Sequence, residues 1–139
     1  MVSDYLQHLA EVPLFAGLSK KDLQKIAKAS DEVTVEAGRE LVTQGKTGRE
    51  CFIILSGTAK VTRNGVEVAT LGPDEYFGEL ALLDGGPRTA TVTAETDLAT
   101  LVLTQRSFAG VIDEVPGLAH KLMSSLAARL RQLDRQHYG

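Results

Sequence analysis

Cysteine and tryptophan are almost absent from this sequence, which contains one cysteine, Cys51, and no tryptophan. A single cysteine cannot form an internal disulfide, so the chain cannot rely on the disulfide framework that stabilises many small secreted domains. Cys51 lies at the start of the apolar run CFIIL, and we expect it to be buried as a small hydrophobic residue.

Neither sign of charge dominates, because 15 Lys and Arg residues face 18 Asp and Glu residues, for a formal net charge of −3. Such a chain has no global field that attracts a polyanion, so no nucleic-acid partner is expected. No apolar run reaches the roughly 20 residues of a membrane helix, and the first residues lack the basic-then-apolar order of a signal peptide. We therefore expect a cytoplasmic protein without a membrane partner.

Histidine is also scarce, with only His8, His120 and His137. All three fall in the tail or in segments predicted to be helical, whereas a metal-dependent β-barrel enzyme needs His and carboxylate ligands clustered on strands. The sequence also lacks a Ser-His-acid or Cys-His set for covalent catalysis. We predict no catalytic residue, no metal, no cofactor and no enzymatic activity.

The sequence does contain a clear change of pattern along its 139 residues, a length suited to one domain. Residues 1–31 carry apolar positions at helical spacing, with a second helix predicted from about Lys20 to Ala29 after an N-cap at Ser19. Residues 32–104 consist of short β-branched runs separated by Gly, Asp and Asn, and residues 105–139 are helical again. The predicted strands span 33–35, 40–44, 51–56, 58–63, 66–71, 90–95 and 99–104.

Asn64-Gly65 is the strongest hairpin signal in the chain, because both positions tolerate a positive φ. The strands on either side should pair antiparallel. The expected fold class is α+β, with an antiparallel, jelly-roll-like β-roll flanked by N-terminal and C-terminal helices.

Residues 77–92, FGELALLDGGPRTATV, interrupt the strands with a short helix-like piece and a Gly-Gly-Pro turn. This stretch resembles the phosphate-binding cassette of the cyclic-nucleotide-binding domain family, which includes catabolite-activator-type regulators, kinase regulatory subunits and gated channels. The order of helices, β-roll and helices fits the same family. The resemblance implies a stand-alone sensor of cAMP or cGMP, whose C-terminal segment forms the family's B and C helices. The sequence ends at Gly139 without a helix-turn-helix for DNA binding.

Arg88 and Glu79 carry the chemistry expected of this cassette. A guanidinium is planar and permanently charged, and it donates two parallel hydrogen bonds to phosphate oxygens, which a lysine cannot do. The resemblance implies that Glu79 accepts a hydrogen bond from the ribose 2′-hydroxyl and that backbone N–H groups of the cassette face the phosphate. The predicted ligand-binding residues are Gly78, Glu79, Leu80, Ala81, Arg88, Thr89 and Ala90.

The purine base is not assigned by these residues. Thr89 could bond a guanine amino group or the phosphate, or it could simply begin a strand. The resemblance places Leu55 and Val68 in the pocket, although the strand pattern alone makes each a core residue. It also aligns Leu133 and Asp134 with a polar pair that reads adenine in the regulators, and Leu133 departs from that pair. Leu130, Leu133 and Asp134 are therefore candidate lid residues, and the choice between cAMP and cGMP stays open.

The C-terminal helix carries a stripe of leucines at intervals of three or four residues. These are Leu118, Leu122, Leu126, Leu130 and Leu133. The stripe could pack on the β-roll, cover the base, or form the seam of a homodimer or a contact with a partner protein. Arg129, Arg131 and Arg135 are interpreted as the solvated face of this helix. The alternative function is a β-roll interaction module that acts through this helix without a nucleotide.

Overall fold

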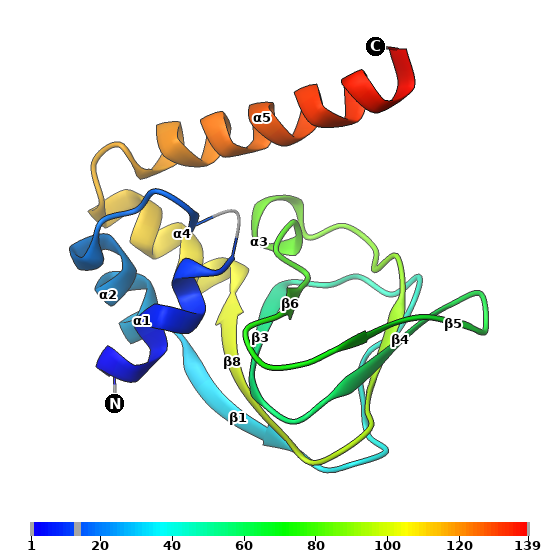
Figure 1. The fold of residues 1–139 in the computed structure, drawn as a ribbon. Helices are drawn as coiled ribbons and strands as arrows, with labels where there is room; N and C mark the ends of the chain where they lie inside the picture. The colour runs from blue at the N-terminus through cyan, green and yellow to red at the C-terminus, as the bar shows by residue number, and fades with distance from the viewer. Residues whose placement is uncertain (1, 13–14, 139) are drawn as a thin grey trace.

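The computed structural model describes residues 2–12 and 15–138. Two antiparallel sheets form a β-roll, and the helices gather at one end of it (Figure 1). This is the α+β architecture that the sequence predicts.

The first sheet has the strand order β1-β8-β3-β6 and the second has the order β2-β7-β4-β5. The first comprises β1 (Asp31–Val35), β3 (Glu50–Ser56), β6 (Tyr76–Phe77) and β8 (Leu98–Thr104). The second comprises β2 (Glu40–Val42), β4 (Ala59–Arg63), β5 (Val66–Leu71) and β7 (Thr91–Ala94). Sequence patterning missed only β6, whose two residues are too few to show a period.

Asn64 and Gly65 form the turn between β4 and β5, with φ values of 53° and 80°. Arg63 pairs directly with Val66 across this turn, which makes it a two-residue hairpin. The hairpin predicted from Asn64-Gly65 is therefore confirmed.

Two helices precede the β-roll, α1 (Val2–Ala10) and α2 (Lys20–Ala29). The Ser19 hydroxyl caps α2 by accepting a hydrogen bond from the Asp22 N–H at 3.1 Å, as predicted from the sequence. After β8 come α4 (Gln105–Glu114) and α5 (Leu118–Tyr138), joined by a turn in which Gly117 has a φ of 81°. The short α3 (Ala81–Asp84) lies between β6 and β7.

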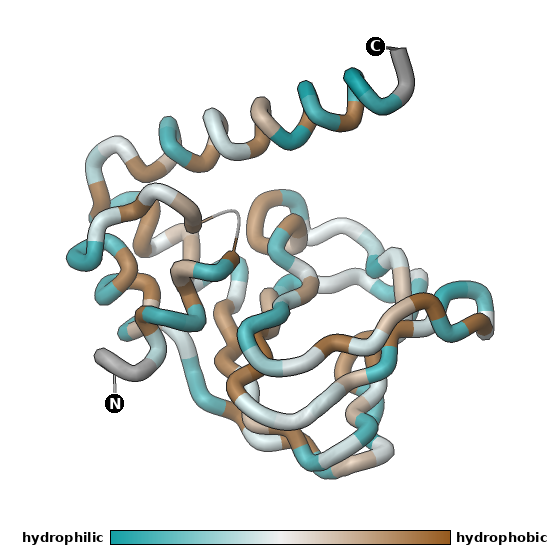
Figure 2. The backbone as a smooth tube through the Cα atoms, in the orientation of Figure 1, coloured by the Kyte–Doolittle hydropathy of each residue, from teal (hydrophilic) through white to brown (hydrophobic). Residues whose placement is uncertain are grey.

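Two apolar clusters stabilise this arrangement, and β3 contributes to both. Side chains alternate across a strand, so Cys51 and Ile53 pack among the helices while Ile54 points into the β-roll. Cys51 is fully buried, as expected, and burial raises the pKa of its thiol. Apolar residues concentrate where the helices meet the roll and along its interior (Figure 2).

The α5 helix is packed at its start and exposed further along. Leu118 and Leu122 are buried and Leu126 is partly buried against the helical cluster, whereas Leu130 and Leu133 are 67% and 52% exposed. Figure 1 shows why, since α5 crosses above α4 and α3 and then extends away from the roll. Within the described ranges, no helix is long and apolar enough to span a membrane.

Candidate functional site

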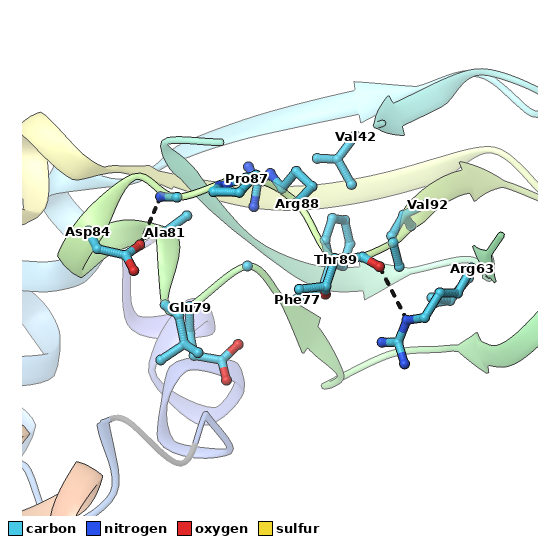
Figure 3. A pocket seen from close by; sticks show the side chains of 15 residues that line it. Val42, Arg63, Phe77, Glu79, Ala81, Asp84, Pro87, Arg88, Thr89 and Val92 are labelled. Carbon is cyan, nitrogen blue, oxygen red and sulfur yellow. Dashed lines mark hydrogen bonds between the residues drawn. The ribbon is translucent and has the colours of Figure 1, made fainter. Parts of the chain in front are cut away.

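A cavity of about 430 Å³ opens between the β-roll and the segment that contains α3. Val42, Val61, Phe77 and Val92 line one part of it with apolar surface, and the rest is lined by the cassette and by Arg63 (Figure 3). A cavity of this size, mostly apolar with a few convergent polar groups, is typical of a site for a small molecule.

The Arg88 side chain lies in a narrow slot between two glycines. A Cβ atom added at Gly48 or at Gly78 would overlap the Arg88 guanidinium. Gly78 also has a φ of 82°, which favours glycine. The side chain is only 8% exposed, and burial lowers the pKa of its guanidinium while the charge of Glu50 opposes that effect.

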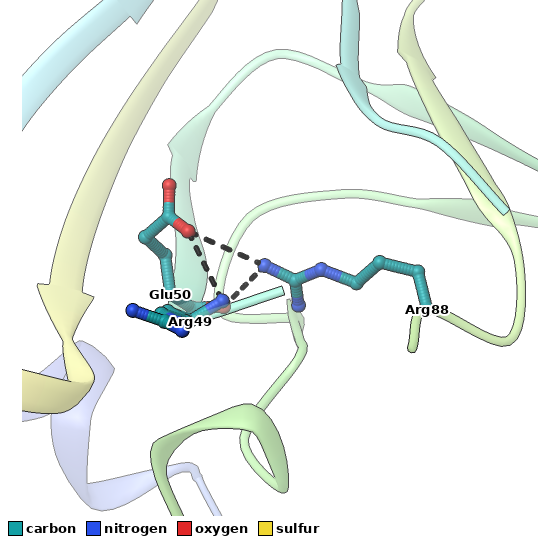
Figure 4. A network of polar contacts seen from close by, with 3 residues as sticks. All are labelled: Arg49, Glu50 and Arg88. Carbon is teal, nitrogen blue, oxygen red and sulfur yellow. Dashed lines mark hydrogen bonds and ion pairs between the residues drawn. The ribbon is translucent and has the colours of Figure 1, made fainter. Parts of the chain in front are cut away.

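Arg88 Nη2 donates a hydrogen bond to the Glu50 carbonyl oxygen at 2.8 Å and lies 3.8 Å from the Glu50 carboxylate (Figure 4). The carboxylate is turned back on its own strand, where it accepts the Arg49 N–H at 3.2 Å. Two contacts to Glu50 use part of the five-donor capacity of the guanidinium and fix its orientation. The remaining donors are held at the wall of the cavity.

The turn after α3 brings Arg88 to this position. Gly85 ends α3 with a φ of 62°, and the Gly86 N–H donates to the Asp84 carboxylate at 2.8 Å. The loop between β2 and β3 then holds the returning chain, because the Arg88 N–H donates to the Lys46 carbonyl at 2.8 Å and the Gly45 N–H to the Arg88 carbonyl at 2.8 Å. Sequence reasoning missed the role of this loop, in which Lys46 lies 42 residues before Arg88.

Backbone donors surround the same cavity. Across residues 2–12 and 15–138, the N–H groups of Glu79, Leu80, Thr89 and Ala90 have no hydrogen-bond acceptor, although all four residues line the cavity. The Ala81 N–H differs, because it donates to the Gly78 carbonyl at 3.0 Å. The structure therefore places Gly78, Leu80, Ala81, Thr89 and Ala90 together with Glu79 and Arg88, but the Ala81 N–H is already used.

Glu79 is bound by a residue that sequence reasoning placed elsewhere. Arg129 Nη2 of α5 donates to Glu79 Oε1 at 2.8 Å, and the Glu79 side chain is 12% exposed. Arg129 was predicted to lie on the solvated face of the helix, and this prediction is wrong because α5 passes above α3 and turns Arg129 toward the cassette. Burial and the charge of Glu79 raise the pKa of the nearby Tyr76, while Arg129 opposes that rise.

The other predicted pocket and lid residues do not line the cavity. Leu55 shares the face of β3 that packs against the helical cluster. Val68 is 52% exposed, because β5 is the edge strand of its sheet. Leu130, Leu133 and Asp134 are exposed on the C-terminal part of α5, which lies above the β-roll and apart from it (Figure 1).

Metal-ligating residues do not cluster within residues 2–12 and 15–138. In the part of the chain that the structure describes, no three His, Cys, Asp or Glu side chains come together as they would around an ion. The Glu79 and Asp84 carboxylates at the cavity already accept hydrogen bonds from Arg129 and from the Gly86 N–H. The other charged groups there are the guanidiniums of Arg63 and Arg88, which suit an anion.

Comparison with known proteins gives this geometry a context. A family model described as "Cyclic nucleotide-binding domain" matches residues 32–115. A cAMP-dependent protein kinase regulatory subunit of Yarrowia lipolytica is 39% identical over 115 residues, or 81% of this chain and 31% of that protein. A cyclic AMP receptor protein of Thermus thermophilus is 34% identical over 127 residues, or 88% of this chain and 59% of that protein. The chain thus spans between about one third and three fifths of the length of these relatives.

Among solved structures, the N-terminal domain of a transcriptional regulator from Streptomyces coelicolor A3(2) has a TM-score of 0.85 and 34% sequence identity. That match covers 92% of this chain and 95% of the other. The catabolite activator protein of Thermus thermophilus has a TM-score of 0.73 and 33% identity, and covers 89% of this chain and 61% of that one.

Proposed function

Because this chain belongs to the cyclic nucleotide-binding domain family, we propose that its cavity binds cAMP or cGMP and that α5 responds to the bound nucleotide. In this proposal the protein is a sensor and not an enzyme, and the nucleotide is its ligand with no further cofactor. Gly78, Glu79, Leu80, Ala81, Arg88, Thr89 and Ala90 are its proposed binding residues.

The arrangement of donors around Arg88 is the observation that carries the proposal. A cyclic nucleotide carries one negative charge on its phosphodiester, and this anion needs a cation and several N–H groups. Arg88 supplies the charge from its slot between Gly48 and Gly78, and the free N–H groups of the cassette line the same cavity. Because the guanidinium is already held by Glu50, little side-chain entropy is lost when it binds the phosphate.

Glu79 and Arg129 provide a site for the ribose. The Glu79 carboxylate accepts hydrogen bonds only, so it is suited to the 2′-hydroxyl of a ribonucleotide. Arg129 Nη1 is buried and has no hydrogen-bond partner in the described ranges. A ribose hydroxyl that donates to Glu79 can accept from this nitrogen, which would satisfy both groups at once.

The apolar residues of the cavity suit the face of a purine. Val61 on β4 and Val92 on β7 lie opposite each other in the sheet, and both line the cavity together with Phe77. A base placed against them buries apolar surface on both partners. This part of the cavity accepts adenine and guanine alike, and the names of the relatives mention cyclic AMP.

The response follows from the contact between Glu79 and Arg129, since one residue lies at the cavity and the other on α5. A ligand that binds Glu79 changes the partner of Arg129 and so shifts the preferred position of the helix, by its differential affinity for the two positions. The exposed Leu130 and Leu133 lie beyond this contact and are available to a second copy of the chain or to another protein.

Calorimetric titration tests this function. The protein is titrated with cAMP and with cGMP, and 5′-AMP and 5′-GMP serve as controls that lack the cyclic phosphodiester. We expect saturable 1:1 binding of at least one cyclic nucleotide and much weaker binding of the controls. The absence of saturable binding with both cyclic nucleotides would exclude the proposal.

A further inference from the structure

Arg63 is a second cation that lines the cavity, and neither the phosphate site nor the ribose site uses it. We propose that Arg63 reads the purine base and makes this chain select a 6-oxopurine, so that it binds cGMP more tightly than cAMP. The inference rests on the proposed function, because it assigns the base of the same ligand.

The position of Arg63 follows from its strand. Side chains alternate along β4, so Arg63 lies on the same face as Val61, and both line the cavity. Figure 3 shows Arg63 at the end of the lining group that is far from Glu79. If the purine lies against Val61 and Val92, Arg63 stands at the outer edge of the base.

The guanidinium of the exposed Arg63 is anchored at one nitrogen and still has free donors. Its Nε donates to the Thr89 carbonyl at 3.2 Å. The strand end is fixed as well, because Gln44 Nε2 donates to Asn64 Oδ1 at 2.9 Å and the Asn64 N–H donates to Gln44 Oε1 at 2.8 Å. In the described ranges no carboxylate pairs with Arg63, and its two terminal nitrogens have no acceptor.

The two purines present different groups to such a fork. Guanine offers two acceptors side by side, O6 and N7, which a guanidinium binds with two parallel hydrogen bonds. Adenine offers N7 beside the N6 amino group, which is itself a donor and opposes a second N–H. An arginine at this edge therefore favours guanine by about 5-fold to 100-fold in affinity.

The test compares three cyclic nucleotides in one competition assay: cGMP, cAMP and the cyclic monophosphate of inosine, which has O6 and N7 but no 2-amino group. The wild-type protein should bind the inosine and guanosine compounds with similar affinity, and cAMP at least about 5-fold more weakly. Arg63→Lys keeps the charge but loses the fork, and it should reduce this difference to less than about 2-fold. Arg39→Lys, at an exposed arginine outside the cavity lining, should leave the difference unchanged.

Several results would overturn the inference while leaving nucleotide binding intact. One such result is that cAMP binds at least as tightly as the inosine compound, which is the order that the names of the relatives suggest. Another is a preference for cGMP alone, with the inosine compound bound like cAMP, because the 2-amino group would then be the group that is read. A third is a preference that Arg63→Lys does not change. If no cyclic nucleotide binds, the proposed function fails together with this inference.

Discussion

Arg129 of α5 donates a hydrogen bond to Glu79 of the cassette, with Nη2 and Oε1 2.8 Å apart. The two residues are 50 positions apart in the sequence and join the C-terminal helix to the wall of the cavity. In the proposed function, sensing depends on this link, because the cavity and the exposed end of α5 share no other ion pair within the described residues. A ligand that contacts Glu79 would act on α5 through this pair.

Arg129→Ala should uncouple α5 from the cavity. In the wild type, a saturating cyclic nucleotide should change the amide hydrogen exchange of residues 126–136, since Glu79 gains a new partner. In the variant, exchange in α5 should be faster without ligand and should no longer respond to ligand. Arg131→Ala is the matched control, because Arg131 is exposed on the same helix and is not bound to the cassette. A ligand response of α5 that survives Arg129→Ala would show that the coupling takes another path.

Two glycine substitutions should separate steric overlap with the Arg88 side chain from backbone strain in the same loop. Gly48→Ala places a Cβ on the Arg88 guanidinium without a positive φ, so we expect at least a 10-fold loss of nucleotide affinity, or about 1.4 kcal/mol. Gly45 has a φ of 86°, but nothing lies within 4 Å of a Cβ added there. Gly45→Ala should therefore lower the free energy of unfolding by about 1 to 3 kcal/mol with little effect on nucleotide affinity. Thermal unfolding and calorimetry measure the two effects separately. Equal losses of nucleotide affinity in both variants would contradict the proposal that Gly48 leaves space for the Arg88 side chain.

Glu79→Gln should blunt the preference for a ribonucleotide. The variant keeps an acceptor oxygen but loses the charge that strengthens a hydrogen bond from the 2′-hydroxyl. We expect the ratio of affinities for a cyclic ribonucleotide and its 2′-deoxy form to fall by about 10-fold, or 1.4 kcal/mol. Glu95→Gln, at an exposed glutamate outside the cavity, should leave the ratio as it is. If this ratio of affinities is unchanged in Glu79→Gln, Glu79 does not bind the ribose 2′-hydroxyl.

A second ion pair, between Asp22 of α2 and Lys121 of α5 at 3.2 Å, fixes the start of α5 on the N-terminal helices. Burial alone would raise the pKa of the Asp22 carboxyl, but hydrogen bonds from Lys121 and Ser19 and the charge of Lys121 hold it below its ordinary value. A lowered pKa in the folded state stabilises the protein at neutral pH, and this contribution is lost as the pH falls below the unfolded value of about 3.9.

The free energy of unfolding of Asp22→Asn should therefore be lower than that of the wild type at pH 7, and the difference should shrink toward pH 2. Denaturant unfolding followed by circular dichroism measures it across this range. Asp113→Asn, at an exposed position on α4, is the control. A difference that stays constant with pH would mean that the charge of Asp22 does not contribute.

The sequence predicts local features of this fold well. Helix α2 and the Asn64-Gly65 hairpin depend on residues a few positions apart, and patterns of capping and turn chemistry describe such features directly. The cassette was identifiable for a similar reason, since Glu79 and Arg88 lie in one continuous stretch.

Contacts between distant segments are the part that the sequence could not supply. In the sequence, Arg129 has the helical spacing of the polar residues of α5. Only the path of α5 above α3 shows that its side chain reaches Glu79. Gly48 looks like an ordinary loop glycine, although the Arg88 side chain occupies the space beside it. Arg63 ends a strand, and its place in the cavity follows from the pairing of β4 with β7.

Arg88 is proposed to hold the phosphate of a cyclic nucleotide, and calorimetric titration of Arg88→Ala is the decisive measurement. Arg39→Ala serves as the control, and circular dichroism checks that both variants are folded. Removing the guanidinium leaves the phosphate charge unpaired, so we expect a loss of about 2 to 5 kcal/mol of binding free energy for the wild type's preferred cyclic nucleotide. A folded Arg88→Ala variant that binds this nucleotide as tightly as Arg39→Ala would contradict it.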